Sequence, residues 1–578
     1  MYVIGINSVF HESAACLLKD GVILAAAEEE RFNRIKHGKK PSQHSPDELP
    51  RNAIGYCLES AGIALEAVDY IGYSFNPEKM PKEPFHDLFL DGDKWGGQAG
   101  LQIFCESIYR AADALKTMGF RGEVKWIDHH TAHGASAFYA SPFQDAAVLV
   151  IDGIGETNSA ELFSGRGNRL NSLQAISYPA SVGLLWELVS HFLGFSVYDA
   201  AKVMGLAAYG NPQRYLGHFE KVVKLVPNGQ CEMDNTVLPF GGITYDPPWA
   251  NCQGLEILFG FDQRARGQEL TGRHEDIAAS LQVITDRIIR HVTEHLYEIA
   301  GSENLCLAGG VTLNCIANRV AFEQTPFSRL FVQPAAHDAG TALGAASFIW
   351  HHLLGNESRQ PMTHAYLGPS FTNVQIEKGL QAHGLDYRYT DRIEREVAEL
   401  IAQGHIVGFF QGGMEIGPRA LGNRSLLADP RHPDMREILN RKVKHREYFR
   451  PLAPSILQEE VGNWFKIEKE TSASDFMLMA YPVKPSCKEK IPAVVHVDGT
   501  SRIQTVRKDA NPRYHKLISE FQRLTGVPIV LNTSFNDSEP IVCTPKDAIN
   551  TFLKTRIDYL ALGDFLVGKT DNWPRGGA

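Results

Sequence analysis

One arrangement of strands and turns occurs twice in this chain, and it constrains the fold more than any other feature. Residues 2–7 predict a strand that ends in a polar turn, and a hairpin over 14–27 follows with an Asp-Gly turn. The same arrangement returns over residues 148–163, where the turn is acidic and rich in glycine. Asn7 and Asp152 stand at the ends of the equivalent strands. The repeat predicts two duplicated lobes that face one cleft.

The chain has 578 residues, which is too long for one hydrophobic core, so at least two domains are expected. Strand patterns alternate with helical patterns, and this indicates an α/β protein. One helical pattern covers residues 277–299, where apolar residues recur every three or four positions. The alternation of strand and helix patterns is interrupted over residues 351–371 by polar residues, Gly and Pro. We therefore expect domains at 1–355 and 363–571.

Composition excludes several classes of protein. The formal net charge of −10 argues against binding to bulk nucleic acid or to an anionic membrane. None of the nine cysteines forms a CxxC pair, so neither a disulfide framework nor a thiolate zinc site is expected. The N-terminus has no export signal and no run approaches the ~20 apolar residues of a membrane span. A cytoplasmic protein is expected.

A His-x-x-x-His pattern is the strongest chemical signal in the first domain. His129 and His133 are four residues apart, so on a helix they share one face and can bind one metal ion. Asp152 and Asp338 follow strands, where residues from different lobes converge, and would complete an open site. A lone pattern of this kind more often consists of surface or capping histidines.

His11 lies in the turn after the first strand, where a neutral imidazole can take a proton from a hydroxyl. Its alternative interpretation is a solvated loop residue. The strand and double glycine over 304–314 form a corner suited to an anion or nucleotide, and a second such corner occupies 330–340. A double glycine alone is weak evidence.

The second domain has a loop rich in Gly and Arg directly after a strand. Within residues 411–425, glycines let a phosphate approach the backbone, and Arg419 and Arg424 supply forked donors. More cations follow over 441–450, and the polar loop 532–536 follows a further strand. The spacing differs from an ordinary P-loop. A solvated or acid-paired arginine face is the alternative.

The chain resembles the O-carbamoyltransferases of the nodulation-factor, cephamycin and tobramycin type over nearly its whole length. The matching blocks are FHESAACLLKDG at 10–21, EEERFNRIKHG at 28–38, HHTAHGASAFY at 129–139, AKVMGLAAYG at 201–210, LAGGVTLN at 307–314, GPRALGNRSLLADPR at 417–431, REYFRPLAPS at 446–455 and LNTSFND at 531–537. Blocks in this order are highly specific.

The resemblance implies two joined catalytic domains. The N-terminal domain is expected to have an actin-like fold, and the C-terminal domain a YrdC-like α/β fold. Carbamoyl phosphate would be hydrolysed to carbamate in the second domain, and carbamate would attack the ATP α-phosphate to give carbamoyl-adenylate and pyrophosphate. The first domain would pass the carbamoyl group to a hydroxyl of a small acceptor and release AMP.

The resemblance also implies roles for single residues and for cofactors. An Fe²⁺ ion would be bound by His129, His133, Asp152 and Asp338. His11 would deprotonate the acceptor hydroxyl. The adenylate would contact Lys202, Gly309, Gly310 and Asn314. ATP, with Mg²⁺, and carbamoyl phosphate would be bound by Arg419, Arg424, Lys444, Arg450, Arg502, Asn532 and Ser534.

Two other functions compete with this one. A tRNA or protein modifier would use the same intermediate, but the acidic net charge speaks against tRNA. An actin-like nucleotide-binding scaffold or sensor would need only one nucleotide site, whereas this chain has two candidate regions. The sequence leaves the acceptor and the oligomeric state open. The aromatic and acidic stretch 75–105 is interpreted either as an acceptor pocket or as a surface insertion.

Overall fold

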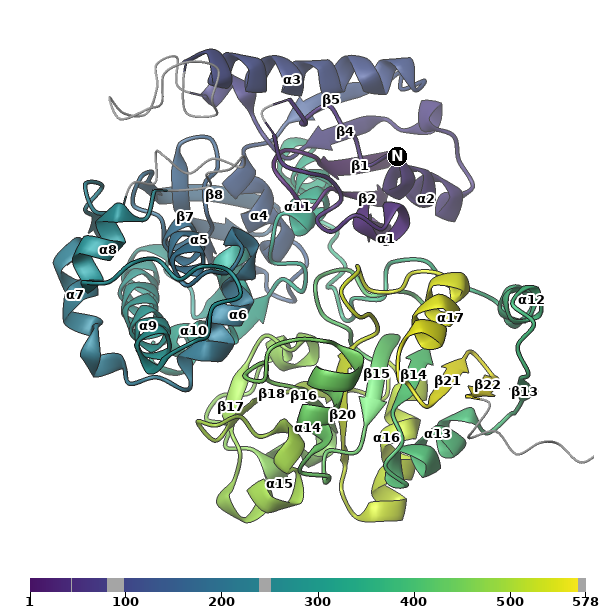
Figure 1. The fold of residues 1–578 in the computed structure, drawn as a ribbon. Coiled ribbons are helices and arrows are strands. Elements are labelled where there is room, and N and C mark those ends of the chain that lie inside the picture. The colour runs from purple at the N-terminus through teal and green to yellow at the C-terminus, as the bar shows by residue number, and fades with distance from the viewer. Residues whose placement is uncertain (43, 81–97, 239–250, 570–578) are drawn as a thin grey trace, which may run out of the picture. The chain divides into compact units, whose positions relative to one another are not determined.

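The computed structural model describes residues 1–578 except residue 43 and the segments 81–97, 239–250 and 570–578 (Figure 1). The chain divides into two compact units. Unit 1 comprises Met1–Asn33 and His37–Met362, and unit 2 comprises Arg34–Lys36 and Thr363–Ala578. Each unit has its own sheets and its own buried apolar residues, as expected for a chain of this length.

Unit 1 contains two five-stranded sheets with one and the same topology. The strand order is β3-β2-β1-β4-β5 in the first sheet and, read from the other edge, β8-β7-β6-β11-β12 in the second. The strands are β1 (Tyr2–Asn7), β2 (Ala14–Lys19), β3 (Val22–Glu28), β4 (Tyr70–Tyr73), β5 (Glu123–Trp126), β6 (Asp145–Ile151), β7 (Asn158–Arg166), β8 (Arg169–Ser177), β11 (Asn304–Ala308) and β12 (Arg329–Val332).

The pairing directions repeat as well. β1 is antiparallel to β2 and parallel to β4, while β6 is antiparallel to β7 and parallel to β11. Asn7 ends β1, and Asp152 follows the last residue of β6. The prediction of duplicated lobes is therefore confirmed, and with it the actin-like organisation of the first domain.

Two helices lie between the sheets of unit 1. Helix α11 (Ala339–Phe348) packs on β1 and β2, helix α4 (His129–Phe138) packs on β6 and β11, and the two helices pack on each other. Small residues allow this close approach, because a Cβ at Gly5 would clash with the Ala342 carbonyl and one at Gly344 with the Ala132 carbonyl. As a result, the N-terminal ends of α4 and α11 come close to the end of β6.

Further helices cover the second lobe (Figure 1). The apolar period over 277–299 forms the long helix α9, whose buried face includes Ile277, Leu281 and Ile288. The helices of unit 1 also include α5 (Val182–Phe192), α6 (Ala200–Ala207), α9 (Gly272–Ala300) and α10 (Cys315–Glu323).

Unit 2 is built on one mixed sheet of eight strands in the order β13-β22-β21-β14-β15-β20-β16-β19. These strands are β13 (Arg388–Tyr389), β14 (Val407–Phe410), β15 (Arg424–Ala428), β16 (Ala453–Leu457), β19 (Gln504–Val506), β20 (Ile529–Ser534), β21 (Tyr559–Leu562) and β22 (Phe565–Gly568). The helices of the unit include α12 (Asn373–Ala382), α13 (Ile393–Ala402), α16 (Pro512–Thr525) and α17 (Pro545–Lys554). Strands and helices alternate in both units, which confirms the α/β class.

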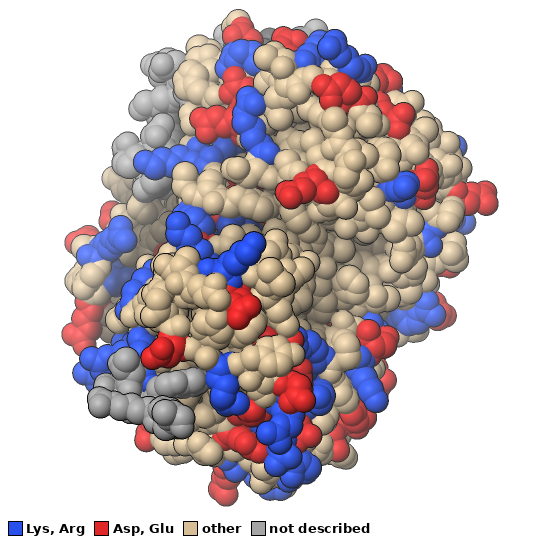
Figure 2. All heavy atoms as spheres, turned by 90° about the vertical axis from the view of Figure 1, so that its right-hand side faces the viewer, with Lys and Arg blue, Asp and Glu red and all other residues tan. Residues whose placement is uncertain are grey.

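The described helices include none that is long and apolar enough to cross a membrane. On the face drawn in Figure 2, basic and acidic side chains are interspersed. Charge on that face is therefore mixed in sign, so an anionic ligand would depend on a local group of cations.

Candidate functional site

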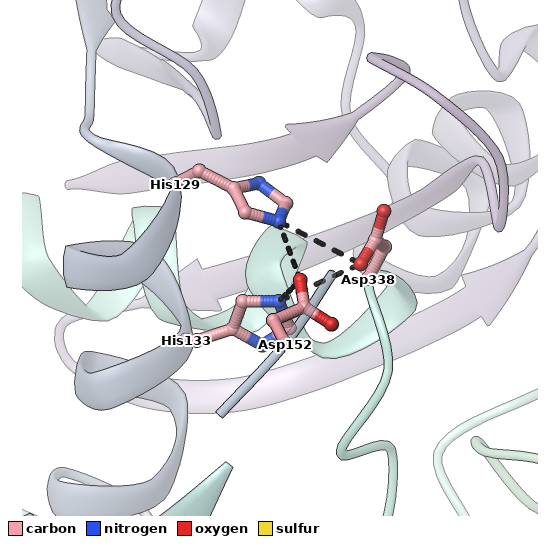
Figure 3. A group of neighbouring side chains, drawn as sticks. All are labelled: His129, His133, Asp152 and Asp338. Atoms are coloured by element: carbon pink, nitrogen blue, oxygen red, sulfur yellow. Dashed lines mark hydrogen bonds and ion pairs between the residues drawn. The ribbon is translucent and has the colours of Figure 1, made fainter. Parts of the chain in front are cut away.

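Four side chains predicted to bind a metal converge in unit 1. His129 and His133 project from the first turns of α4, Asp152 follows β6, and Asp338 precedes α11 (Figure 3). All four are buried, and one donor atom of each lies within 4.8 Å of the others. Nε2 of His129 is 3.2 Å from Oδ2 of Asp152 and 3.6 Å from Oδ1 of Asp338. Nε2 of His133 is 3.4 Å and 3.5 Å from the same two oxygens.

These residues fit a first-row divalent cation. Ligand atoms about 2.1 Å from an ion stand about 3.0 Å apart at right angles and about 3.4 Å apart at the tetrahedral angle. The four nitrogen-to-oxygen distances agree with such spacings. Two imidazoles and two carboxylates suit iron, zinc or cobalt better than a thiolate-binding metal. The donor set itself does not choose among these ions.

The surroundings of His129 fix which of its nitrogens faces the site. Its Nδ1 lies 3.2 Å from the carbonyl oxygen of Ser74, so Nδ1–H donates there and Nε2 points to the carboxylates. Asp152 is oriented in a similar way, because its Oδ1 accepts a 2.9 Å hydrogen bond from the backbone N–H of Gly310. Its other oxygen, Oδ2, is then left for the imidazoles.

The electrostatics of the four residues are those of a cation site. Burial alone would lower the pKa of His129, but the carboxylates of Asp338 and Asp152 hold that pKa well above its ordinary value. The pKa of His133 is raised in the same way against its burial. Burial would raise the pKa of Asp152, yet the two imidazoles hold it well below the usual range. When no metal is bound, the carboxylates therefore favour the protonated form of both imidazoles.

His11 lies beside this cluster. Its Nδ1 is 3.8 Å from Oδ2 of Asp338, the carboxylate oxygen that is turned away from the two histidine ligands. Asn7 holds the turn, since its Nδ2 donates to the backbone carbonyls of His11 and Glu12 at 2.9 and 3.0 Å. The His11 ring lies edge-on to Tyr198, with ring centroids 5.6 Å apart. The structure thus places the predicted base next to the predicted metal ligands.

The residues expected to contact the adenylate have other partners in the structure. The Gly310 amide is bonded to Asp152, and Gly309 has a φ of 94° where a Cβ would clash with the carbonyl of Ile151. The Asn314 side chain caps α10 by accepting from two backbone amides, and its Nδ2 donates to Gln282. Lys202, on α6, pairs with Asp199 at 3.1 Å. The corner therefore supports a metal ligand and the start of α10, while its contact with an adenylate stays a prediction.

Sequence reasoning missed several acidic residues around the cluster. Glu187 on α5 has a buried Oε2 with no hydrogen-bond partner among the described residues. Burial, with the charges of Asp152 and Asp338, raises its pKa to about 8. Glu12 pairs with His37 at 2.6 Å, and both residues have positive φ angles of 54° and 65°. Strained backbone of this kind is concentrated at functional sites. Glu12 could have been identified from the sequence because it adjoins His11. The sequence around Glu187 indicates only an amphipathic helix, so it gives no signal for this residue.

Unit 2 contains a group of four cationic side chains, Lys444, Arg446, Arg450 and Arg502, whose acidic neighbours are Glu447, Asp537 and Glu539. Lys444 is buried, and its ammonium donates to Ser534 and, at 2.6 Å, to Oδ1 of Asn536. Burial together with the charges of Arg446 and Arg450 holds the pKa of Lys444 well below its ordinary value. Burial, Arg450 and Arg502 lower the pKa of Arg446 to about 9. Four positive side chains held this close indicate an anion site.

Arg446 was not among the predicted residues, although it lies inside the block 446–455 that carries part of the resemblance. Its Nε donates to Oδ1 of Asn440, and its Nη2 is buried with no hydrogen-bond partner among the described residues. Arg450 and Arg502 were predicted for this role. Their partial burial keeps them within reach of a ligand.

Two predicted anion ligands instead hold the loops in place. Arg424 is fully buried, where its guanidinium donates to the carbonyls of Gln411 and Pro369 and stacks on Phe410. Asn532 donates to Ser455 and Gln504. Sequence alone does not separate an arginine that binds phosphate from one that binds carbonyls, because both follow glycine-rich loops. Arg419 is half-buried in the same loop.

The stretch interpreted as an acceptor pocket or surface insertion is only partly described. Residues 81–97, including the predicted Phe85, Asp87, Phe89, Asp91, Asp93 and Trp95, lie outside the described residues. Phe75 is fully buried and packs against Phe10 and Phe104. This end of the stretch therefore belongs to the core of the first lobe.

Comparison with known proteins covers both units. The family model described as "Carbamoyltransferase N-terminus" matches residues 2–347, and "Carbamoyltransferase C-terminus" matches residues 398–569. The nodulation protein NolNO of Sinorhizobium fredii is 37% identical over 98% of this chain and 81% of its own length. An uncharacterised protein of Synechocystis, sll1178, is 39% identical over 98% of this chain and 97% of its own length.

Solved structures align with a smaller part of the chain. HypF of T. kodakarensis aligns with 61% of this chain and 48% of its own, at 15% identity and a TM-score of 0.32. TM-scores this low carry no argument about the site.

Proposed function

This chain belongs to the carbamoyltransferase family, and on that premise we propose that it is an ATP-dependent O-carbamoyltransferase with two reaction sites. Unit 2 makes carbamoyl-adenylate from ATP and carbamoyl phosphate. Unit 1 transfers the carbamoyl group to a hydroxyl of a small natural product. The observation that carries the proposal is the presence of two different sites, a buried His₂Asp₂ cluster in unit 1 and a cation group in unit 2.

The cation group suits the first reaction. Water cleaves carbamoyl phosphate to carbamate and phosphate, and a carbamate oxygen then attacks the α-phosphorus of ATP. The bond to the β-phosphate breaks, and pyrophosphate leaves. Lys444, Arg446, Arg450 and Arg502 would bind the phosphate oxygens and offset the charge that builds up. Ser534 and Asn536 hold the Lys444 ammonium in place, so it is oriented before the substrates arrive.

The first unit suits the second reaction. His11 takes the proton of the acceptor hydroxyl, and the hydroxyl oxygen bonds to the carbamoyl carbon while the bond from that carbon to the AMP phosphate oxygen breaks. Oδ2 of Asp338 lies 3.8 Å from Nδ1 of His11 and would stabilise the imidazolium that forms. His129, His133, Asp152 and Asp338 would hold a divalent cation, proposed as Fe²⁺, which would supply Lewis acidity toward the adenylate phosphate.

The proposal is tested by following the fate of ATP. Metal-replete protein with ATP, Mg²⁺ and carbamoyl phosphate should form AMP and pyrophosphate in equal amounts. Acetyl phosphate in place of carbamoyl phosphate is the matched control and should give neither product. Formation of ADP, or of no nucleotide product, would contradict the proposal. Candidate hydroxylated acceptors should then gain a carbamoyl group by mass spectrometry only when ATP is present.

A further inference from the structure

Glu156 joins the loop that carries one metal ligand to the helix that carries two others. It lies in the turn after β6, four residues beyond Asp152, and its side chain is buried. Its Oε1 accepts hydrogen bonds from the backbone N–H of His129 at 2.9 Å and of Asn76 at 2.8 Å. Oε2 lies 3.2 Å from the same His129 nitrogen. The carboxylate thus binds two other segments of unit 1 to the turn in which it lies.

These bonds supply a cap that α4 does not provide for itself. Asp128 occupies the N-cap position but makes no side-chain capping bond. Its Oδ1 accepts from Nδ2 of Asn76 instead, at 2.9 Å. The first N–H of α4 therefore depends on Glu156, and a carboxylate is favoured at this end of a helix by the helix dipole.

The position of the cap affects the ligands directly. The bonded amide belongs to His129 itself, and His133 lies one turn later on α4. The turn of Glu156 packs tightly on the same helix end, because a Cβ at Gly155 would lie 3.0 Å from Nδ1 of His130. Ser74, two residues before Asn76, supplies the carbonyl that fixes the His129 ring. The hydrogen bonds of the Glu156 carboxylate thus help to fix the distance between Asp152 and the two imidazoles.

We propose that Glu156 is a positioning residue for the metal centre, which holds α4 and the Asp152 loop at the separation that a divalent cation requires. It contributes no ligand atom. This inference rests on the proposed metal site. It adds that metal affinity depends on hydrogen bonds to backbone amides of residues 76 and 129.

Titration of the full-length protein with Co²⁺ tests the proposal without an acceptor substrate. Visible absorption reports the ligand geometry, and competition with a chelator gives the affinity. Glu156→Ala should bind Co²⁺ about 10 to 100-fold more weakly than the unchanged protein, the loss typical when a residue supporting a metal ligand is removed. Its absorption bands should also change. Glu156→Gln keeps Oε1 as an acceptor for both amides and should recover most of the affinity.

Glu161→Ala is the matched control. Glu161 lies five residues further along, on β7, where its carboxylate accepts from Ser172 and makes no contact with α4 among the described hydrogen bonds. It should leave Co²⁺ binding unchanged. If Glu156→Ala does not fold, Glu156→Asp shortens the carboxylate by one methylene and should give an intermediate loss.

The outcomes separate the inference from the proposed function. Wild-type affinity and spectrum in both Glu156→Ala and Glu156→Asp would overturn the positioning role. Equal loss in Glu156→Gln and Glu156→Ala would also overturn it, because the hydrogen bonds would then not be the cause. Failure of the unchanged protein to bind Co²⁺ or Fe²⁺ would instead refute the metal centre itself.

Discussion

The backbone amide of Gly310 donates a 2.9 Å hydrogen bond to Oδ1 of Asp152. The glycine corner after β11 thereby holds a carboxylate whose other oxygen faces His129 and His133. In the duplicated fold, this corner and the Asp152 turn follow the neighbouring parallel strands β11 and β6, which end at the same edge of the sheet. The bond is thus a consequence of topology, and it makes a backbone group part of the support of the metal centre.

Gly310→Ala should weaken metal binding. The new Cβ would lie 3.0 Å from Oδ1 of Asp152, so the carboxylate must shift away from the imidazoles. We expect a loss of about 10-fold or more in Co²⁺ affinity, with little change in the thermal unfolding midpoint. Gly272→Ala is the control, because a Cβ there meets no atom within 4 Å. Unchanged Co²⁺ affinity in Gly310→Ala would show that the carboxylate is held by other contacts.

Metal affinity should rise with pH. Without a cation, the two aspartates raise the pKa values of His129 and His133 against the effect of burial, which favours the protonated imidazoles. A metal must displace these protons, and raising the pH removes the competition. Calorimetric titrations with Co²⁺ in two buffers of different ionisation enthalpy should reveal proton release. The variant His133→Ala should release fewer protons on binding Co²⁺. Binding without proton release at neutral pH would contradict the raised pKa values.

The duplicated lobes were predictable because strand and turn chemistry is local. The strand before Asn7, the Asp20-Gly21 turn and the later repeat each follow from residues close in sequence. The His129–His133 helix face also follows from spacing alone. Asp338 could be assigned to the same site because it follows β12, which with β11 and β6 forms the parallel part of the sheet, and ligands converge where parallel strands end.

Other features depend on how a loop folds or on contacts between distant segments. Glu156 caps α4 from a turn 27 residues away, and Glu415, in unit 2, accepts amides of Leu421 and Asn423 within its own loop. Arg424 was predicted to bind phosphate, yet its guanidinium fills the core of the same loop. Residue type and spacing do not reveal which partner a buried charge will find, since that depends on how the loop folds.

The two reaction sites should be separable by mutation. Arg450→Ala should reduce carbamoyl phosphate-dependent pyrophosphate formation by about 100-fold or more, because a cation aimed at a phosphate in a dry site contributes strongly. His133→Ala should leave pyrophosphate formation largely intact and let carbamoyl-adenylate accumulate, detected by mass spectrometry. Arg441→Ala is the control for unit 2, since Arg441 is 80% exposed and pairs with Glu437. Equal loss of pyrophosphate formation in both variants would refute a two-site scheme.

Arg446→Gln should stabilise the ligand-free protein while weakening its response to phosphate. Arg446 lies among Lys444, Arg450 and Arg502, and burial with its positive neighbours lowers its pKa to about 9, so it remains charged and repelled at neutral pH. Relieving the repulsion should raise the thermal unfolding midpoint of unit 2. The expected rise is about 2–4 °C for each kcal/mol gained in the free energy of unfolding. Inorganic phosphate at constant ionic strength should then raise the midpoint less in the variant than in the unchanged protein, because a ligand that binds more weakly stabilises the folded state less. Arg523→Gln, which removes a half-exposed cation paired with Glu520 on α16, should change neither quantity. A lower midpoint with an unchanged phosphate response would mean that Arg446 supports the fold and does not bind the anion.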